Sequence, residues 1–374
     1  MSLFSLLQAY SALKHPRLIS IPSHLPFLQL HDFLLSEILL NPHLLQYPPS
    51  NTYQLSFWKW VIDRLEILLG DQAGEDAEID QRMYDRLVSL VAISKPAAYD
   101  TIAPPPPSFV THYWYPAPRS DPPASTGAVS STEYHSVTLF ESRTTIESGT
   151  TGLRTWRASF VLAQFLLENS TLLVDKSVLE LGSGTGFLGL IVADIQVSSG
   201  GLTGLPALHL TDVNGDVLRR CLENTQLACN ASHRHGNLSV RSMDWFDALE
   251  KDDVPNVQAY LNIIAPDLVL GTDILYHPDM ISPFLATLDI ALRASRSPGG
   301  GIAYLALTVR NADLLDSFLL AISDHNLSAE ELRYFDHDFR SCFLEPSEGV
   351  DEEVKIFKIA LHSSSPHTPT LQYT

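Results

Sequence analysis

The stretch Val178-Leu-Glu-Leu-Gly-Ser-Gly-Thr-Gly-Phe-Leu-Gly-Leu190 decides the fold, because it combines a buried strand, a glycine turn and a helix start in unbroken succession. Gly182, Gly184 and Gly186 allow a sharp turn and leave no side chain between the backbone and a ligand. The helix that begins near Phe187 points its free amides toward the same place. We therefore predict a ligand site at this turn; a tight strand-to-helix turn without a ligand is the alternative.

The residues around the turn indicate which ligand it binds. A phosphate-binding loop of the Gly-Lys-Ser or Gly-Lys-Thr type would place a lysine directly after the turn, and this turn has no basic residue. Glu180, two residues before the first glycine, would repel a pyrophosphate and attract a cation. S-adenosylmethionine has no phosphate and carries an amino group and a sulfonium. We therefore predict S-adenosylmethionine as the cofactor.

Composition places the chain among ordinary globular proteins, with 45% apolar and 18% charged residues over 374 positions. No apolar run is long enough to cross a bilayer, so we expect no membrane partner. The three cysteines, Cys221, Cys229 and Cys342, show no metal-site spacing and cannot all pair. We therefore expect no metal, and a reducing compartment, the cytoplasm, as the location.

The net charge of −19, from 24 basic and 43 acidic residues, bears on the choice of partner. Binding to a nucleic acid backbone relies on clustered Lys and Arg, which this balance disfavours. A positively charged protein or small molecule is favoured instead, because net charge steers encounters. We expect a monomer that binds a protein substrate and makes no direct contact with nucleic acid.

Composition also changes along the chain and predicts four parts. Residues 1–95 show helical spacing of apolar residues and form an N-terminal helical domain. Residues 96–132 are rich in proline and form a linker that contains an aromatic island at Phe109–Tyr115; a Pro-x-x-Pro ligand is the alternative. Residues 133–362 form the main domain, and residues 363–374 a flexible tail.

The main domain alternates strands and helices, which predicts an α/β fold. Strands are expected at 136–141, 177–181, 207–210, 238–241, 267–271, 301–307, 332–343 and 353–361, and helices at 155–167, 187–195, 216–229 and from the Ser282-Pro283 cap through Leu292. The last two strands form an antiparallel pair at the edge. We predict a seven-strand Rossmann-like sheet, mostly parallel, with helices on both faces and ligands at the carboxyl ends of its strands.

Acidic and aromatic residues follow the next two strands. Asp212 comes after the strand at 207–210, where a carboxylate can accept both ribose hydroxyl protons; a helix N-cap is the alternative. Asp244 and Trp245 follow the strand at 238–241, where the acid can accept from the adenine amine and the ring can cover the base. For Trp245, a place in the hydrophobic core is equally compatible with the sequence.

The strand at 267–271 ends in Gly271-Thr-Asp-Ile-Leu-Tyr-His277. Gly271 lets the backbone approach a ligand, and Asp273 and Tyr276 extend from the strand end, where a methyl group would be delivered. An acid followed by an aromatic ring suits a cationic amine, through charge pairing and a cation–π contact. We predict that Asp273 captures and orients the ammonium group.

These motifs together carry a family resemblance that covers roughly residues 137–361. Glu147-Ser-Gly-Thr-Thr-Gly-Leu-Arg-Thr-Trp156, the glycine turn, Leu210-Thr-Asp212, Asp244-Trp245 and Asp273-Ile-Leu-Tyr276 resemble the seven-strand protein-lysine methyltransferases that act on non-histone proteins. More narrowly, the string from Gly149 to Trp156 with the helical N-terminal part resembles the eukaryotic elongation factor 2 lysine methyltransferase family.

The resemblance implies an S-adenosylmethionine-dependent protein-lysine N-methyltransferase whose substrate is elongation factor 2. It also implies that Trp156, Gly182, Ser183, Gly184, Trp245, Gly271 and Thr272 contact the cofactor, and that Asp273 to Tyr276 is an Asp-x-x-Tyr element near the substrate. Two rival functions remain from the sequence: a cofactor-binding scaffold with vestigial activity, and a methyltransferase for another protein, a small amine or a nucleic acid.

Overall fold

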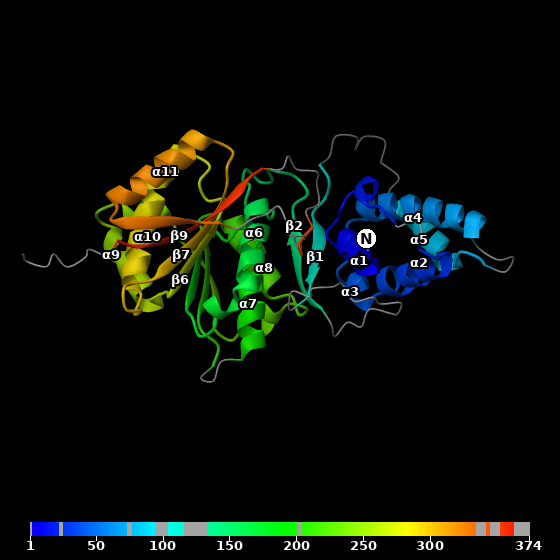
Figure 1. The fold of residues 1–374 in the computed structure, drawn as a ribbon, viewed down its shortest axis with the longest axis horizontal. Coiled ribbons are helices and arrows are strands. Elements are labelled where there is room, and N and C mark those ends of the chain that lie inside the picture. Colours follow the sequence, from blue (N-terminus) through cyan, green and yellow to red (C-terminus); the bar gives the residue numbers. More distant parts are fainter. Residues whose placement is uncertain are drawn as a thin grey trace, which may run out of the picture.

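The computed structural model describes residues 2–21, 25–72, 77–93, 104–115, 134–200, 204–333, 342–344 and 352–362. Along the long axis of the molecule, a helical part is followed by a two-stranded sheet and then by a larger sheet between helices (Figure 1). The predicted tail at 363–374 and the linker stretches 96–103 and 116–132 lie outside the described residues. The division into domains with those boundaries stays a prediction.

The N-terminal part is helical, as the spacing of its apolar residues predicts. Its elements are α1 (Leu3–Ser11), η1 (Pro16–Leu18), α2 (Phe27–Phe33), the π-helical η2 (Leu34–Leu39), α3 (Pro42–Gln46), α4 (Asn51–Gln72) and α5 (Gln81–Ile93). Trp58, Val61 and Leu65 recur at helical intervals on α4 and are at most 1% exposed. They join apolar residues of α1, α2 and α5 in one hydrophobic core.

A β-hairpin lies between this helical part and the larger sheet (Figure 1). Its strands are β1 (Ser108–Trp114), which contains most of the aromatic island, and β2 (His135–Glu141), paired antiparallel. Neighbouring side chains of β1 face opposite sides: Tyr113 packs into the helical core, whereas Trp114 packs into the core of the larger sheet. His43 of α3 forms side-chain hydrogen bonds to Thr111 at 3.2 Å and Thr138 at 3.0 Å. The hairpin therefore joins the two cores.

The larger sheet has seven strands, as predicted, and the strand expected at 136–141 is β2 of the hairpin and lies outside this sheet. The seven strands are β3 (Val178–Leu181), β4 (Leu208–Asp212), β5 (Leu238–Ser242), β6 (Leu268–Thr272), β7 (Ile302–Thr308), β8 (Leu327–Leu332) and β9 (Val354–Leu361), in the order β5-β4-β3-β6-β7-β9-β8. The five strands from β5 to β7 are parallel, and β9 runs antiparallel to both neighbours. The strand order reverses at β3, which places a crevice beside its carboxyl end.

Helices cover both faces of this sheet. The helices α6 (Arg157–Glu168), α7 (Phe187–Ser199) and α8 (Gly215–Thr225) contribute to the core on the face toward the hairpin. The helices α9 (Val254–Ile264), α10 (Ile281–Ala294) and α11 (Ala312–Asp324) cover the other face. Helix α7 is buried along most of its length because α6, the short helix η4 (Ala231–Arg234) and strand β2 of the hairpin all pack against it.

Two local predictions were wrong. The strand expected at 332–343 is β8, which ends at Leu332; residues 334–341 lie outside the described residues. Its apolar signal is weak because the middle of this edge strand is exposed. The Ser282-Pro283 cap is also absent, since α10 begins at Ile281 and these two residues lie inside its first turn. Proline is tolerated there because first-turn amides have no partner within the helix.

The hairpin contains one buried histidine, His112, from which we expect a dependence of stability on pH. His112 in β1 is 2% exposed, and its ring lies 5.0 Å from that of Phe160 and 5.2 Å from that of Phe187. Neither ring nitrogen has a hydrogen-bond partner among the described residues. Burial penalises the charged form and lowers the pKa of His112 to about 3.

We therefore expect replacement of His112 by phenylalanine to reduce the loss of stability on acidification. The unfolded chain binds a proton on this residue near pH 6.5, so its contribution is complete above that pH and is lost as the pH falls toward 3. The loss reaches at most about 1.4 kcal/mol per pH unit. Urea midpoints at pH 7.5, 6.0 and 5.0 measure it, with His233→Phe at an exposed position as the control. Equal pH dependence in wild type and His112→Phe would contradict the assignment.

Candidate functional site

The glycine turn between β3 and α7 adopts backbone angles that favour glycine. Gly182 and Gly184 have φ values of +73° and +53°. A Cβ atom added to Gly182 would lie 3.1 Å from a methyl group of Ile274 and 3.6 Å from the Trp245 ring. A Cβ atom added to Gly184 would lie 3.2 Å from the carbonyl oxygen of Gly152. The turn is therefore packed closely between two other segments of the chain.

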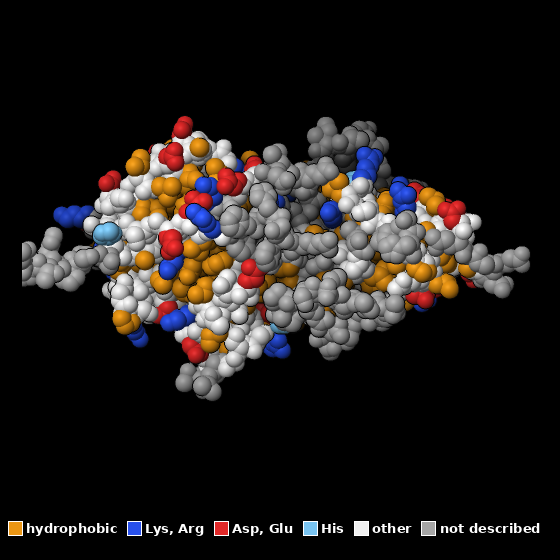
Figure 2. Space-filling view, in the orientation of Figure 1, with side chains coloured by type: hydrophobic (Ala, Val, Ile, Leu, Met, Phe, Trp, Pro, Cys, Tyr) orange, Lys and Arg blue, Asp and Glu red, His pale blue; other side chains and the backbone are white. Residues whose placement is uncertain are grey.

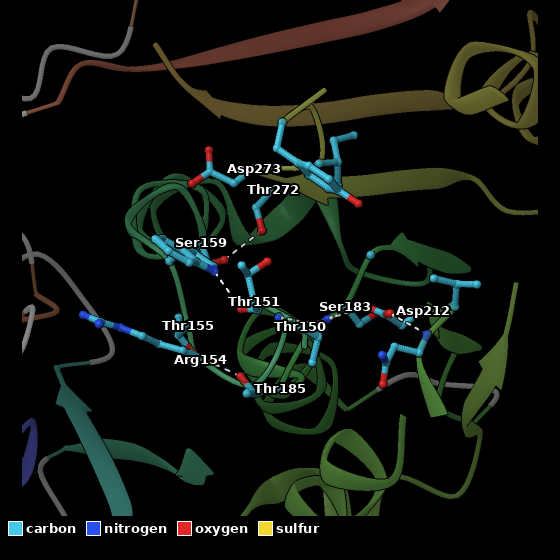
Figure 3. Close-up of a pocket in the computed structure, with 18 of the residues that line it drawn as sticks. Thr150, Thr151, Arg154, Thr155, Ser159, Ser183, Thr185, Asp212, Thr272 and Asp273 are labelled. Atoms are coloured by element: carbon cyan, nitrogen blue, oxygen red, sulfur yellow. Dashed lines mark hydrogen bonds between the residues drawn. The ribbon is translucent and has the colours of Figure 1, made fainter. Parts of the chain in front are cut away.

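A cavity of about 430 Å³ opens at this turn (Figure 3). Ten residues predicted for the site line it: Trp156, Gly182, Ser183, Gly184, Asp212, Asp244, Trp245, Thr272, Asp273 and Tyr276. They come from the carboxyl ends of β3, β4, β5 and β6 and from the start of α6, which the fold brings to one edge of the sheet. Glu180, Gly186 and Gly271 do not belong to the lining.

Glu180 lies behind the turn instead of facing the cavity. Its side chain points toward α7, where one carboxyl oxygen lies 3.1 Å from the place that a Cβ atom added to Gly189 would occupy. The residue is 2% exposed, and burial raises the pKa of its carboxyl group to about 8. The group is therefore mostly protonated at neutral pH. The predicted attraction between a charged Glu180 and a cationic ligand does not fit this position.

The two other predicted residues outside the lining have packing environments. A Cβ atom on Gly186 would lie 2.9 Å from the sulfur of Cys221, so this glycine lets α8 approach α7. Gly271 lies within the sheet, with its Cβ position 3.1 Å from the side chain of Leu305 in β7. Both glycines therefore allow close packing of the elements that surround the cavity.

Asp212 reaches from the end of β4 to the glycine turn. Its Oδ2 accepts a hydrogen bond from the Gly184 amide at 3.2 Å, and its Oδ1 accepts one from the Asn214 amide at 3.1 Å. The N-cap of α8 is Asn214, whose side chain accepts from the amides of Asp216 and Val217. The alternative of a helix N-cap was therefore wrong for Asp212. Burial raises the pKa of this carboxyl group, against the effect of the amide hydrogen bonds.

Trp245 has both a core contact and a place in the cavity lining. Its ring packs against Phe284 of α10 at 5.2 Å, which is a core contact, and it also lines the cavity beside Gly182. The neighbouring Asp244 accepts a hydrogen bond from the Phe246 amide at 3.0 Å and caps the short helix η5 (Trp245–Ala248). This cap fixes the start of η5 and thereby the position of Trp245, its first residue.

The segment 149–156 forms a whole wall of the cavity. Of this segment, only Trp156 was predicted to contact the cofactor. Six further residues of the segment also line the cavity: Gly149, Thr150, Thr151, Gly152, Arg154 and Thr155. The indole nitrogen of Trp156 donates to the carbonyl of Thr151 at 3.1 Å, which folds the segment back on itself. Its two glycines and three threonines directly before a helix were a signal that could have identified it.

A buried acid connects this segment to the glycine turn. Glu141, the last residue of β2, is 5% exposed, and its carboxylate accepts hydrogen bonds from the hydroxyl groups of Thr155 and Thr185. Burial raises the pKa of Glu141, and the two hydroxyl groups lower it. Asn224 of α8 donates to the carbonyl of Thr185 at 2.9 Å. The hairpin and α8 thus hold the glycine turn together.

Asp273 is also held by neighbouring residues, contrary to its predicted role. It has a φ of +49°, and its side chain is 6% exposed. Its carboxylate accepts hydrogen bonds from the amide of Thr308 at 2.8 Å, from the hydroxyl of Thr308 at 2.9 Å and from Arg310 at 3.1 Å. An ammonium ion would have to compete with these three donors. The simple capture of a substrate cation by Asp273 therefore does not fit its surroundings.

Beside Asp273 lies a further functional candidate, Arg310, and the predicted Tyr276 belongs to the same cavity. The Arg310 guanidinium lies 5.2 Å from the centre of the Trp156 ring and 3.3 Å from the Glu352 carboxylate. Tyr276 is 70% exposed and lines the cavity. Arg310 carries no local signal that links it to the site, because the residue follows β7 and approaches the site only in the folded chain.

The cavity meets the requirements of S-adenosylmethionine. Its volume is within the range of about 300 to 1,000 Å³ that is typical of small-molecule sites. The glycine turn presents backbone without side chains, and Asp212 provides an acid at the end of β4. Arg154 is the basic residue in the lining, which suits a ligand with a carboxylate and no phosphate.

Comparison with known proteins gives consistent matches. A family model described as lysine methyltransferase matches residues 136–318. The chain is 31% identical over 282 residues to protein-lysine N-methyltransferase EFM3 of Chaetomium thermophilum, covering 75% of each chain. It is 25% identical to protein-lysine N-methyltransferase EEF2KMT of Bos taurus over 80% of this chain and 79% of that protein. For EEF2KMT of Homo sapiens the identity is 32%, over 49% of this chain and 53% of that protein.

Replacing Gly182 by alanine should weaken binding of S-adenosylmethionine by about tenfold or more. Alanine is strained at this positive φ, and its methyl group would crowd Ile274 and the cavity floor. Titration calorimetry measures the change. The matched control is Gly215→Ala at the start of α8, where an added Cβ meets nothing within 4 Å. If both variants bind as tightly as wild type, the turn is not the cofactor site.

Proposed function

This chain belongs to the family of lysine methyltransferases that includes EFM3 and EEF2KMT, and we propose that the lysine it methylates lies in elongation factor 2. It is an S-adenosylmethionine-dependent protein-lysine N-methyltransferase. The observation that carries this function is the cavity at the glycine turn, which brings the family's motifs together at one edge of the sheet. The choice of elongation factor 2 is supported by the names of the EEF2KMT relatives.

We assign the cofactor contacts to the residues that line the cavity. S-adenosylmethionine, when bound, supplies an electrophilic methyl group on a positively charged sulfur. Asp212 is placed to accept hydrogen bonds from the ribose hydroxyls, and Asp244 and Trp245 are placed beside the adenine. Arg154 offers a guanidinium group for the carboxylate of the amino-acid end.

We place the acceptor lysine at the other part of the cavity, between Trp156, Asp273 and Tyr276. Figure 3 shows Asp212 and Asp273 on different sides of the cavity. The exposed ring of Tyr276 can cover the alkyl chain of an incoming lysine. The amine must be neutral to attack the methyl carbon, and loss of its proton at pH 7 costs roughly 4 to 5 kcal/mol. The chain's residues therefore have to align the amine and favour its neutral form.

The cytoplasm as location and a monomeric state are also part of the proposal. The cysteines Cys221, Cys229 and Cys342 are free thiols, which suits a reducing compartment. On the face that Figure 2 shows, Lys and Arg side chains of the described residues are scattered singly among acidic ones, an arrangement that suits a protein partner better than a nucleic acid.

Among the described residues, no helix combines the length and the apolar character that crossing a bilayer requires.

The substrate assignment predicts one labelled band. Incubation of the enzyme with methyl-labelled S-adenosylmethionine and purified elongation factor 2 should label that protein on lysine, as mass spectrometry of its peptides would show. A parallel reaction with a cell lysate tests selectivity. Label on another protein, with none on elongation factor 2, would refute the substrate and keep the activity. If no protein is labelled in either reaction, the proposed function fails.

The ribose assignment predicts a loss of cofactor affinity in Asp212→Ala. The variant removes a charged acceptor of two hydroxyl protons, so the Kd for S-adenosylmethionine should rise between about tenfold and a hundredfold. The control is Asp216→Ala, an acid in the first turn of α8 that pairs with Arg219 at 3.0 Å and does not line the cavity. Similar affinities for the two variants would argue against a role of Asp212 in binding.

A further inference from the structure

The surroundings of Asp273 bear on how the acceptor lysine loses its proton. A carboxylate without a partner beside an amine stabilises the ammonium form and raises the pKa of that amine. Such a carboxylate would therefore oppose a reaction that needs the neutral amine. Asp273 lines the cavity at the acceptor end, and its carboxylate already receives three hydrogen bonds, one of them from the Arg310 guanidinium.

Arg310 is held in place by groups from three parts of the fold. The end of β6 supplies Asp273 at 3.1 Å, and the residues before β9 supply Glu352 at 3.3 Å. The start of α6 supplies the face of the Trp156 ring at 5.2 Å. A guanidinium remains protonated in proteins, so Arg310 carries a permanent positive charge at this place. The side chain is 41% exposed, which leaves it close to the solvent that receives a proton.

We propose that Arg310 neutralises Asp273 and thereby allows the acceptor lysine to reach the cofactor as a neutral amine. This inference rests on the proposed lysine methyltransferase function. Arg310 acts through Asp273 and is a positioning residue. Its guanidinium also packs over the ring of Trp156, which lines the same part of the cavity. The Arg310–Asp273 ion pair therefore sets both the charge and the shape of the part of the cavity that receives the lysine.

The charges around the acceptor end support this balance. Among the described residues, Glu352 before β9 pairs with Arg310, Arg154 lies 5.9 Å from the Trp156 ring that Arg310 also contacts, and Tyr276 on the loop after β6 lines the same cavity. Glu353 contacts the adjoining backbone, where its carbonyl accepts from the Val309 amide. Because Arg154 is assigned to the carboxylate of the cofactor, Arg310 is the arginine that balances Asp273 and Glu352 beside the cavity. Loss of Arg310 leaves net negative charge there, which favours a charged lysine.

The test is the pH dependence of kcat/KM for methylation of purified elongation factor 2. In Arg310→Gln, the rising limb of the profile should move to higher pH by about one unit, so that activity at pH 7.5 falls about tenfold and recovers near pH 9.5. Arg310→Lys keeps the charge, and its limb should stay at the wild-type position at a lower rate. The control Arg293→Gln removes an exposed arginine of α10 that pairs with Asp289, and should leave the limb in place.

Two further variants make the result decisive. Asp273→Asn removes the carboxylate charge that Arg310 balances and leaves Arg310 paired with Glu352 alone, so the limb of this variant should move to lower pH. The double variant Asp273→Asn with Arg310→Gln should return toward wild type. A uniform loss of rate with an unshifted limb in Arg310→Gln would overturn the inference in favour of simple packing. If Arg310→Gln does not fold, an unshifted limb in Asp273→Asn overturns it. Absence of activity in wild type refutes the proposed function instead.

Discussion

The left-handed backbone of the glycine turn is the constraint on which the site depends. Three segments distant in sequence converge on it: Asp212 accepts the Gly184 amide, Asn224 donates to the Thr185 carbonyl, and Gly152 lies against Gly184. Side chains at these glycines would push the segments apart. The turn therefore determines where the ends of β3 and β4 and the start of α6 lie relative to one another.

The hairpin gives the N-terminal helices a physical connection to this turn. His43 of α3 bonds to Thr111 and Thr138 at the centre of the hairpin, and Glu141 at its end accepts from Thr155 and Thr185. Strand β2 thus connects the two parts: Thr138 is hydrogen-bonded to the helical part, and Glu141 is hydrogen-bonded to residues at the cavity. Because the hairpin is buried on both faces, its residues contribute to two cores at once.

Acidic residues near the cavity differ in role because they differ in burial and partners. Glu180 is buried behind the turn, and its raised pKa keeps it mostly neutral. Asp212 lies in the cavity wall and receives backbone amides. Asp273 is paired with an arginine that comes from a different strand end. All three are acids at or near the ends of adjacent strands, and their chemistry is set by the groups that surround them.

Local patterns in the sequence were sufficient for the sheet, the glycine turn and ten of the residues that line the cavity. Strands and helices follow from apolar periodicity, and parallel strands bring their carboxyl ends to one edge, so Asp212, Trp245 and Asp273 could be predicted to meet. Strand β8 was misplaced because an exposed edge strand has little apolar signal. The direction of the Glu180 side chain and the Arg310–Asp273 pair required the tertiary structure. Those features depend on contacts between residues far apart in the chain, and side-chain burial and ion pairing are properties of such contacts, which no local pattern records.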